Sequence, residues 1–129
     1  MRLTETEAVT LVEAYFAALE AFDAQALAAT LTEDCVLTIE THGARTEGRA
    51  AIVDLFATRW AGDGPRARHH TFTHTPAPAH GRVASQFTVT YTGGGNVVDA
   101  KSNANVFTLR EGRIAAIQVY MAGANTIRT

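Results

Sequence analysis

The sequence predicts a single α+β domain in which helices cover one face of an antiparallel sheet. Helix-forming patterns fill the first half of the chain, whereas the second half alternates strand-like segments with turns. A length of 129 residues suits one domain around one core, so we assign residues 1–129 to that domain. Apolar residues make up 47% of the chain and charged residues 19%, a balance that excludes intrinsic disorder.

The first half of the chain predicts three helices. Thr4 and Glu7 have the spacing of a capping box, and apolar residues over 8–22 then recur at helical spacing. An aspartate at the start of 23–31 can cap a second, shorter helix. A third helix over 49–61 follows a glycine and is ended by a run of Gly, Asp and Pro.

The remaining segments predict strands and turns. Residues 32–34 end the second helix, a strand follows over 36–41, and residues 42–45 form a turn. Glycines 93–95 connect two strands and lack a neighbouring Lys-Ser/Thr pair, so they predict a hairpin turn and not a phosphate-binding loop. The strands of the second half are predicted at roughly 67–76, 82–92, 96–109 and 113–122.

The side chains of the strand over 96–109 separate by polarity. Because side chains alternate across a strand, one face carries Asp99, Lys101, Asn103, Asn105 and Phe107. The other face carries Ala100, Ser102, Ala104 and Val106. The polar row faces either water, as in a half-exposed antiparallel sheet, or a binding pocket. The ring of Phe107 favours a face that is at least partly buried.

Composition and charge exclude several classes of function. The formal net charge of −2 gives no electrostatic footprint for nucleic acid. No apolar run approaches the ~20 residues that a membrane span needs, and the first residues are not an apolar signal segment, so we expect a cytoplasmic protein. Cys35 is the single cysteine, which excludes a thiolate metal cluster and predicts a small buried side chain.

The histidines near residue 70 do not predict a metal site. His69 and His70 point to opposite faces of their strand. His70 and His74 share a face but lie roughly 13 Å apart along it, whereas zinc ligands converge at about 2 Å from the ion. We therefore expect no metal ion.

The order of elements and several short motifs resemble the NTF2-like superfamily over essentially the whole chain. The motifs lie at 15–20, 26–27, 32–34, 47–52 and 110–114. Within that superfamily the chain is similar to the branch of ketosteroid isomerases and SnoaL-like polyketide cyclases. The resemblance implies a cone-shaped fold, in which N-terminal helices pack in a curved antiparallel sheet with a pocket at its open end. It also implies a homodimer formed through the outer face of the sheet.

The resemblance further implies which residues form the site. Tyr15 lies where the isomerases keep the tyrosine of their oxyanion hole, and Asn105 lies where they keep a protonated aspartic acid. An Asn can donate a hydrogen bond there at every pH. In this frame the polar row points into the cone, where Lys101 and Asn103 would orient a ligand. The apolar walls would come from Phe56, Trp60, Phe87, Val89, Tyr91, Phe107, Ile117, Val119 and Met121.

The sequence departs from the isomerase pattern at its catalytic base. Ile39 stands where the isomerases have an aspartate, so their route of proton transfer is not expected here. SnoaL-like dehydratases instead place a histidine on the strand after the third helix, and His70 is the best match to it. A slip of one residue in register would exchange His70 with His69. Glu20 matches a dehydratase aspartate five residues after the tyrosine, and imidazole suits a general base near neutral pH.

We therefore expect a protein that binds a small hydrophobic ring compound and catalyses proton transfer on it without a cofactor. The reaction would be an isomerisation, a dehydration or a cyclisation, in which Tyr15 and Asn105 stabilise negative charge and His70 moves the proton. The alternative is a non-catalytic ligand-binding or assembly module on the same fold, which Ile39 favours. Epoxide hydrolysis is the weakest alternative, because the sequence offers no Asp-Arg-Asp set for the pocket.

Overall fold

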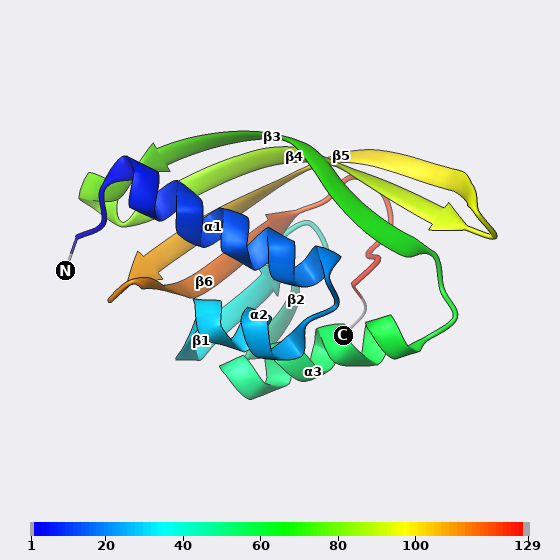
Figure 1. Cartoon of the computed structure of the whole chain (residues 1–129), viewed down its shortest axis with the longest axis horizontal. Helices are drawn as coiled ribbons and strands as arrows, with labels where there is room; N and C mark the ends of the chain where they lie inside the picture. Colours follow the sequence, from blue (N-terminus) through cyan, green and yellow to red (C-terminus); the bar gives the residue numbers. More distant parts are fainter. Residues whose placement is uncertain (1, 128–129) are drawn as a thin grey trace.

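The computed structural model describes residues 2–127, which form three α-helices, a short 3-10 helix and six strands (Figure 1). The helices are α1 (Glu5–Glu20), α2 (Ala24–Thr30) and α3 (Arg49–Ala61), and the 3-10 helix is η1 (Pro78–His80). The strands are β1 (Leu31–Ile39), β2 (Ala44–Glu47), β3 (Arg66–Ala77), β4 (Arg82–Gly93), β5 (Asn96–Arg110) and β6 (Arg113–Tyr120).

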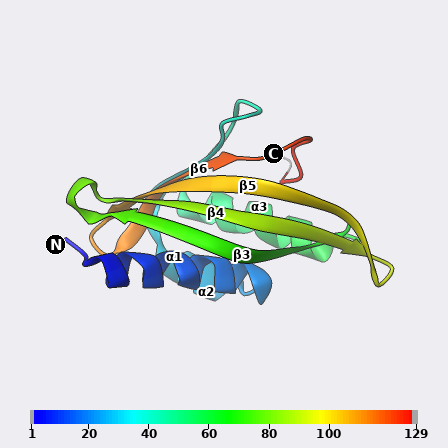
Figure 2. The same ribbon diagram turned by 90° about the horizontal axis from the view of Figure 1, so that it is seen from above.

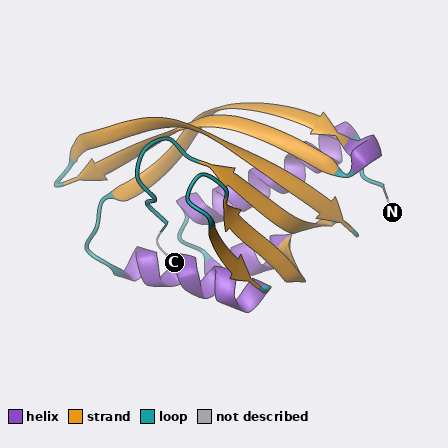
Figure 3. Cartoon of the chain, turned by 180° about the vertical axis from the view of Figure 1, so that it is seen from behind, coloured by secondary structure: helices purple, strands orange, loops and turns teal. Residues whose placement is uncertain are grey.

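The strands form one curved sheet in the order β2-β1-β6-β5-β4-β3. β1 and β6 run parallel, and all other neighbouring strands run antiparallel. The helices gather on the concave side of the sheet, as the two perpendicular views show (Figures 1 and 2). Seen from behind, the sheet lies in front of the helices (Figure 3). The predicted α+β class, with helices packed in a curved sheet, is confirmed.

Helix α1 begins at its predicted capping box and supplies much of the core. Thr4 Oγ1 accepts a hydrogen bond from the Glu7 backbone N–H at 3.1 Å, and Glu7 Oε1 accepts one from the Thr4 N–H at 2.9 Å. The apolar stripe of α1 packs against β3, β4 and β6. The rings of Tyr15 and Phe16 meet the ring of Phe107 edge to face, with centroids 5.3 and 5.8 Å away.

Strand pairing overrides the sequence prediction at two boundaries. Residues 32–34 were predicted to separate the second helix from a strand over 36–41. Instead, β1 already begins at Leu31, whose backbone is extended and which pairs with Ile114 on β6. The predicted turn over 42–45 is also too long, because Ala44–Glu47 pair with β1 and form β2. Both differences depend on partners that local sequence patterns do not show.

The polar row of β5 lies on the concave side of the sheet. Asn103, Asn105 and Phe107 are buried there, whereas Asp99 and Ser102 are exposed. The register of β5 with β4 and β6 sets Asn105 between Ser85 and Val119. The interpretation in which this row faces water is therefore wrong for its central residues.

We expect Thr4→Ala to lower the free energy of unfolding by about 1 kcal/mol, because it removes the side chain that caps α1. Urea denaturation measures the change. Thr10→Ala is the matched control, since Thr10 is exposed within α1, where alanine is the better helix former. The role of the capping box would be refuted if both variants had the same stability.

Candidate functional site

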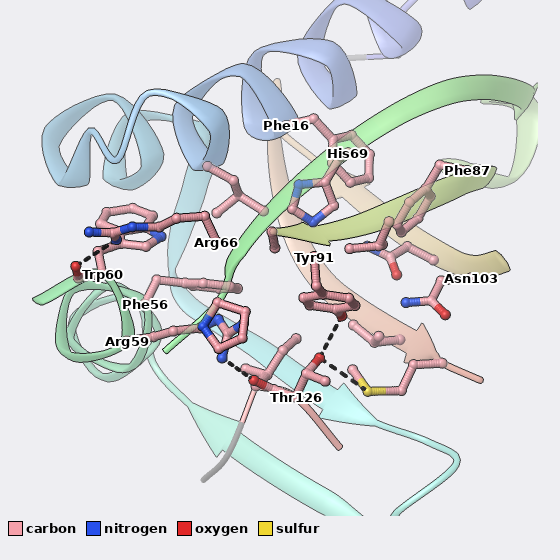
Figure 4. Close-up of a pocket in the computed structure, with 18 of the residues that line it drawn as sticks. Phe16, Phe56, Arg59, Trp60, Arg66, His69, Phe87, Tyr91, Asn103 and Thr126 are labelled. Atoms are coloured by element: carbon pink, nitrogen blue, oxygen red, sulfur yellow. Dashed lines mark hydrogen bonds between the residues drawn. The ribbon is translucent and has the colours of Figure 1, made fainter. Parts of the chain in front are cut away.

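A cavity of about 60 Å³ lies between the concave face of the sheet and helices α1 and α3. Figure 4 shows its residues, which come from both ends of the chain and from every layer of the fold. Aromatic and aliphatic side chains dominate the lining, and a few polar groups converge among them. Such a mixture is typical of sites for small organic ligands.

Most of the predicted site residues line this cavity, and some do not. Those that line it are Tyr15, Phe56, Trp60, Phe87, Val89, Tyr91, Asn103, Asn105, Val119 and Met121. The others are Glu20, His70, Lys101, Phe107 and Ile117. Phe107 and Ile117 are fully buried in the core and do not line this cavity, contrary to the expectation that they form its walls. Lys101 instead reaches Ala124, whose carbonyl oxygen accepts its Nζ–H at 3.2 Å.

The pocket histidine is His69 and not His70. His69 lines the cavity beside Val89, its partner in register on β4. His70 is exposed, and its Nε2 lies 2.6 Å from Thr90 Oγ1 on the other face of the sheet. The structure therefore places His69 at the cavity in place of the expected His70, which is the exchange by one residue that the sequence left open.

Glu20 orients the imidazole of His69. Glu20 Oε2 lies 2.9 Å from His69 Nδ1 and accepts the His69 backbone N–H at 2.9 Å, and Oε1 accepts a hydrogen bond from Arg68 Nε at 2.6 Å. An ionised carboxylate can only accept, so Nδ1 carries a proton and Nε2 of the neutral ring is left as the basic nitrogen. Glu20 therefore acts on the cavity through His69 although it does not line the cavity itself.

The environment of Glu20 keeps its carboxylate ionised. Partial burial would raise the pKa of this carboxyl, but the hydrogen bonds from His69 and Arg68 outweigh burial and lower the pKa to about 2. A permanently ionised Glu20 can hold His69 in one orientation and can stabilise the imidazolium once the ring takes up a proton.

Tyr15 brings a protonated hydroxyl group to the cavity. Its side chain is 1% exposed, and burial, together with the nearby Cys35, raises the pKa of the phenol far above its usual value. The ring is fixed by edge contacts with Phe16 and Phe107. Tyr15 is therefore a hydrogen-bond donor, and not a base, at any physiological pH.

Asn105 is the polar group of the cavity whose hydrogen bonding is incomplete. Its side chain is 4% exposed, and Oδ1 is buried without a hydrogen-bond partner among the described residues. An unpaired buried amide oxygen costs about 1–3 kcal/mol, so a bound ligand or water would relieve it. The neighbouring Asn103 differs, because its Oδ1 accepts the backbone N–H of Ala122 at 3.0 Å.

The sequence did not reveal the cations and the C-terminal residues at the cavity. Arg59 and Arg66 line it, as do Thr126 and Ile127, whereas Asp and Glu are absent from its described lining. Arg59 donates a hydrogen bond to the carbonyl oxygen of Thr126 (Figure 4). These residues are 67 positions apart along the chain, so no local pattern could have paired them. The remaining lining residues that were not predicted are Phe16, Leu19, Pro65 and Ala67.

The described residues form neither a cluster of metal ligands nor a membrane-spanning helix. Within residues 2–127, no three His, Cys, Asp or Glu side chains gather closely enough to hold a metal ion. None of the described helices has the length and hydropathy required to cross a membrane.

Comparisons with known proteins point to one family and one fold. Residues 12–117 match the model of the SnoaL-like domain family. Proposed polyketide cyclases from Xanthomonas campestris pv. campestris and Pseudomonas putida KT2440 are 25% and 27% identical to the chain, with TM-scores of 0.76 and 0.74. The match covers 90% of both chains for the first and 92% of both for the second.

A third solved structure shares the fold. It is an epoxide hydrolase from M. tuberculosis that resembles limonene epoxide hydrolase, with 24% identity and a TM-score of 0.74, and the match covers 92% of this chain and 84% of the other. A search of curated proteins finds no match.

We expect Glu20→Gln to reduce the loss of stability in acid. The pKa of Glu20 is lower in the folded protein than in the unfolded chain. The ionised side chain therefore stabilises the folded protein above about pH 4.5, and this stabilisation is lost as the pH falls toward 2. The wild type should lose about 1–2 kcal/mol more than the variant over this range, a figure discounted for the partial exposure of Glu20. Urea denaturation at pH 7 and pH 3 measures the difference. The exposed Glu40→Gln is the control, and equal acid sensitivity of wild type and Glu20→Gln would contradict the lowered pKa.

Proposed function

The chain belongs to the SnoaL-like domain family, and we propose that it binds a small apolar ring compound and transfers a proton on it. One observation carries this proposal: His69, oriented by Glu20, shares a cavity with Tyr15 and Asn105. A base held by a carboxylate and two hydrogen-bond donors make up the machinery for abstracting a proton next to a carbonyl group.

His69 is the proposed base. Its Nε2 takes a proton from the carbon next to the carbonyl, and the electrons of the broken C–H bond move onto the carbonyl oxygen as an enolate forms. The imidazolium is stabilised by the Glu20 carboxylate 2.9 Å from Nδ1. Return of the proton from the imidazolium to another carbon isomerises the compound. Transfer of that proton to a β-hydroxyl group releases it as water and dehydrates the compound. Attack of the enolate on a second carbonyl closes a ring, and the new alkoxide takes the proton from the imidazolium.

Tyr15 and the Asn105 amide are the proposed donors to the enolate oxygen. Tyr15 keeps its proton because its pKa is raised, and the side-chain N–H groups of Asn105 carry no charge that pH could change. Donors held in place by a packed core stabilise a developing charge without having to reorganise. Tyr15 and Asn105 meet this condition, since both are almost completely buried.

Ile39 supports a second candidate, a module that binds a ligand without converting it. Ile39 is 1% exposed on β1, so the position that holds the base in ketosteroid isomerases is apolar here. In this case His69 would only bind a ligand, and no C–H bond would break. The two candidates differ in whether bound carbonyl compounds exchange hydrogen with solvent.

We expect the protein to exchange the hydrogens next to the carbonyl of 3-methylcyclohex-2-enone for deuterium in D2O, as followed by proton NMR. His69→Asn should slow the enzymatic exchange by about 10²–10⁴-fold, the usual contribution of a general base. His70→Asn is the matched control, because His70 is the neighbouring histidine on the opposite face. Exchange no faster than in buffer for this and related cyclic enones would favour the non-catalytic module.

Asn105→Leu tests the proposed donor. Because Oδ1 of Asn105 has no partner, the substitution should leave the protein folded, with stability equal to or above that of the wild type. The same exchange should slow by about 10²–10³-fold, as when an oxyanion-hole donor is lost. Unchanged exchange in a folded variant would remove Asn105 from the mechanism.

We also propose that the protein is a homodimer formed through the convex face of the sheet. Small side chains such as Ala84 and Ala104 leave this face flat, and Tyr120 on it is 41% exposed. We expect a dimer at micromolar concentration by sedimentation equilibrium, and a monomer for Ala104→Arg. Thr58→Arg on the exposed side of α3 is the control. A monomeric wild type would contradict the proposal.

A further inference from the structure

We infer that the ligand of this cavity carries a carboxylate, which binds Arg59 at the cavity mouth. The inference rests on the proposed function for the apolar body of the ligand and adds its charged group. Three observations lead to it: an arginine with no acidic partner among residues 2–127, a carbonyl oxygen that occupies this arginine, and a cavity smaller than one known to hold benzene.

Arg59 is a partly buried cation that has no counter-charge among the described residues. It lies in the last turn of α3 and lines the cavity, whose described lining includes neither Asp nor Glu. None of the ion pairs among residues 2–127 involves it. Burial lowers the pKa of the guanidinium, Tyr91 raises it in part, and the nearby Arg66 lowers it again. A partly desolvated charge of this kind gains free energy when an anion approaches it.

The other basic groups near the cavity are less suited to bind a ligand anion. His69 faces the carboxylate of Glu20. Arg66 is exposed, and its guanidinium lies 4.6 Å from the ring centroid of Phe22. Arg59 is partly buried, so its charge gains more than that of Arg66 when an anion binds.

The C-terminal segment 122–127, which we call the strap, occupies Arg59 in this structure. The Thr126 carbonyl oxygen accepts the hydrogen bond from Arg59, and the Thr126 hydroxyl lies 2.7 Å from the Tyr91 hydroxyl (Figure 4). Lys101 donates to the carbonyl of Ala124 in the same way. Polar contacts and the packing of Ile127 against the core hold the strap, and Ala122–Ala124 remain exposed. Exposed backbone of this kind is typical of segments that open locally.

The size of the cavity favours such a movement. About 60 Å³ is available, whereas an engineered protein cavity that holds benzene measures about 150 Å³. Withdrawal of Thr126 and Ile127, which both line the cavity, would make room for a ring compound. It would also break the hydrogen bond between Arg59 and the Thr126 carbonyl. A carboxylate would then give Arg59 a charged acceptor, whereas a neutral ligand would give it no counter-charge.

The experiment compares acids with their uncharged amides. Cyclohex-1-enecarboxylate and benzoate, with cyclohex-1-enecarboxamide and benzamide, are titrated by calorimetry at pH 7. Fluorescence of Trp60, the single tryptophan, reports entry into the cavity that it lines. We expect each acid to bind at least tenfold more tightly than its amide, and Arg59→Gln to reduce this ratio to less than threefold. Arg59→Lys should retain part of the preference because it keeps the charge.

Two further variants separate Arg59 from general electrostatics. Arg45→Gln removes an exposed positive charge on β2, and its ratio of acid to amide affinity should equal that of the wild type. Lys101→Gln frees the strap at Ala124 and should speed the binding of acid and amide alike. A loss of acid preference in either variant as large as in Arg59→Gln would overturn the assignment to Arg59.

The outcomes also distinguish this inference from the proposed function. If acid and amide bind equally and Arg59→Gln changes neither affinity, the charge preference is refuted while the ring-binding site stands. If neither class of compound binds or changes the fluorescence of Trp60, the ring-binding site itself is refuted. Arg59→Gln is expected to fold, which the cooperativity of its thermal unfolding verifies.

Discussion

The contact between the Glu20 carboxylate and β3 is the one on which the site depends. Glu20 is the last residue of α1, where a negative charge interacts unfavourably with the helix dipole and costs about 0.3–1 kcal/mol of stability. Three hydrogen-bonding groups of β3 offset this cost, namely the His69 backbone N–H, His69 Nδ1 and Arg68 Nε. The same bonds fasten the end of the helix to the strand and fix the imidazole.

The backbone of β3 keeps His69 in place just before the strand becomes irregular. The pairing of β3 with β4 shifts between His70 and Thr73, and Thr71 has a φ of 58°. A β-branched residue with positive φ is strained, at a cost on the order of 1–3 kcal/mol. Beyond this bulge Phe72 contacts Phe16 and Phe87, ring centroids lying 4.7 and 5.7 Å apart. The bulge therefore lets two nearby side chains of β3 serve different purposes: His69 lines the cavity, and the partly exposed Phe72 contacts the ring of Phe16 on α1.

Local patterns predicted the α+β class because capping and alternation act between neighbours in sequence, whereas the curved sheet was expected from the resemblance to the NTF2-like superfamily. The capping box at Thr4 and the alternation around Asn105 involve neighbours in sequence, so each could be inferred without a structure. The choice between His69 and His70 could not, since it depends on pairing with β4, and a slip of one residue reverses it. Arg59 was missed because its partner, Thr126, is a backbone carbonyl group, and any residue type can supply one.

The charges around the cavity also suggest why an apolar residue, Ile39, suits this position on β1. The cavity lining holds Arg59 and Arg66 and, among its described residues, no carboxylate, while Arg68 partly neutralises Glu20 behind His69. This positive field would favour an acidic ligand and, in the proposed mechanism, would stabilise the negative charge on an enolate oxygen. An aspartate in place of the buried Ile39 would oppose both effects in a poorly screened interior. In the proposed mechanism a base supplied by β3 instead of β1 avoids that repulsion.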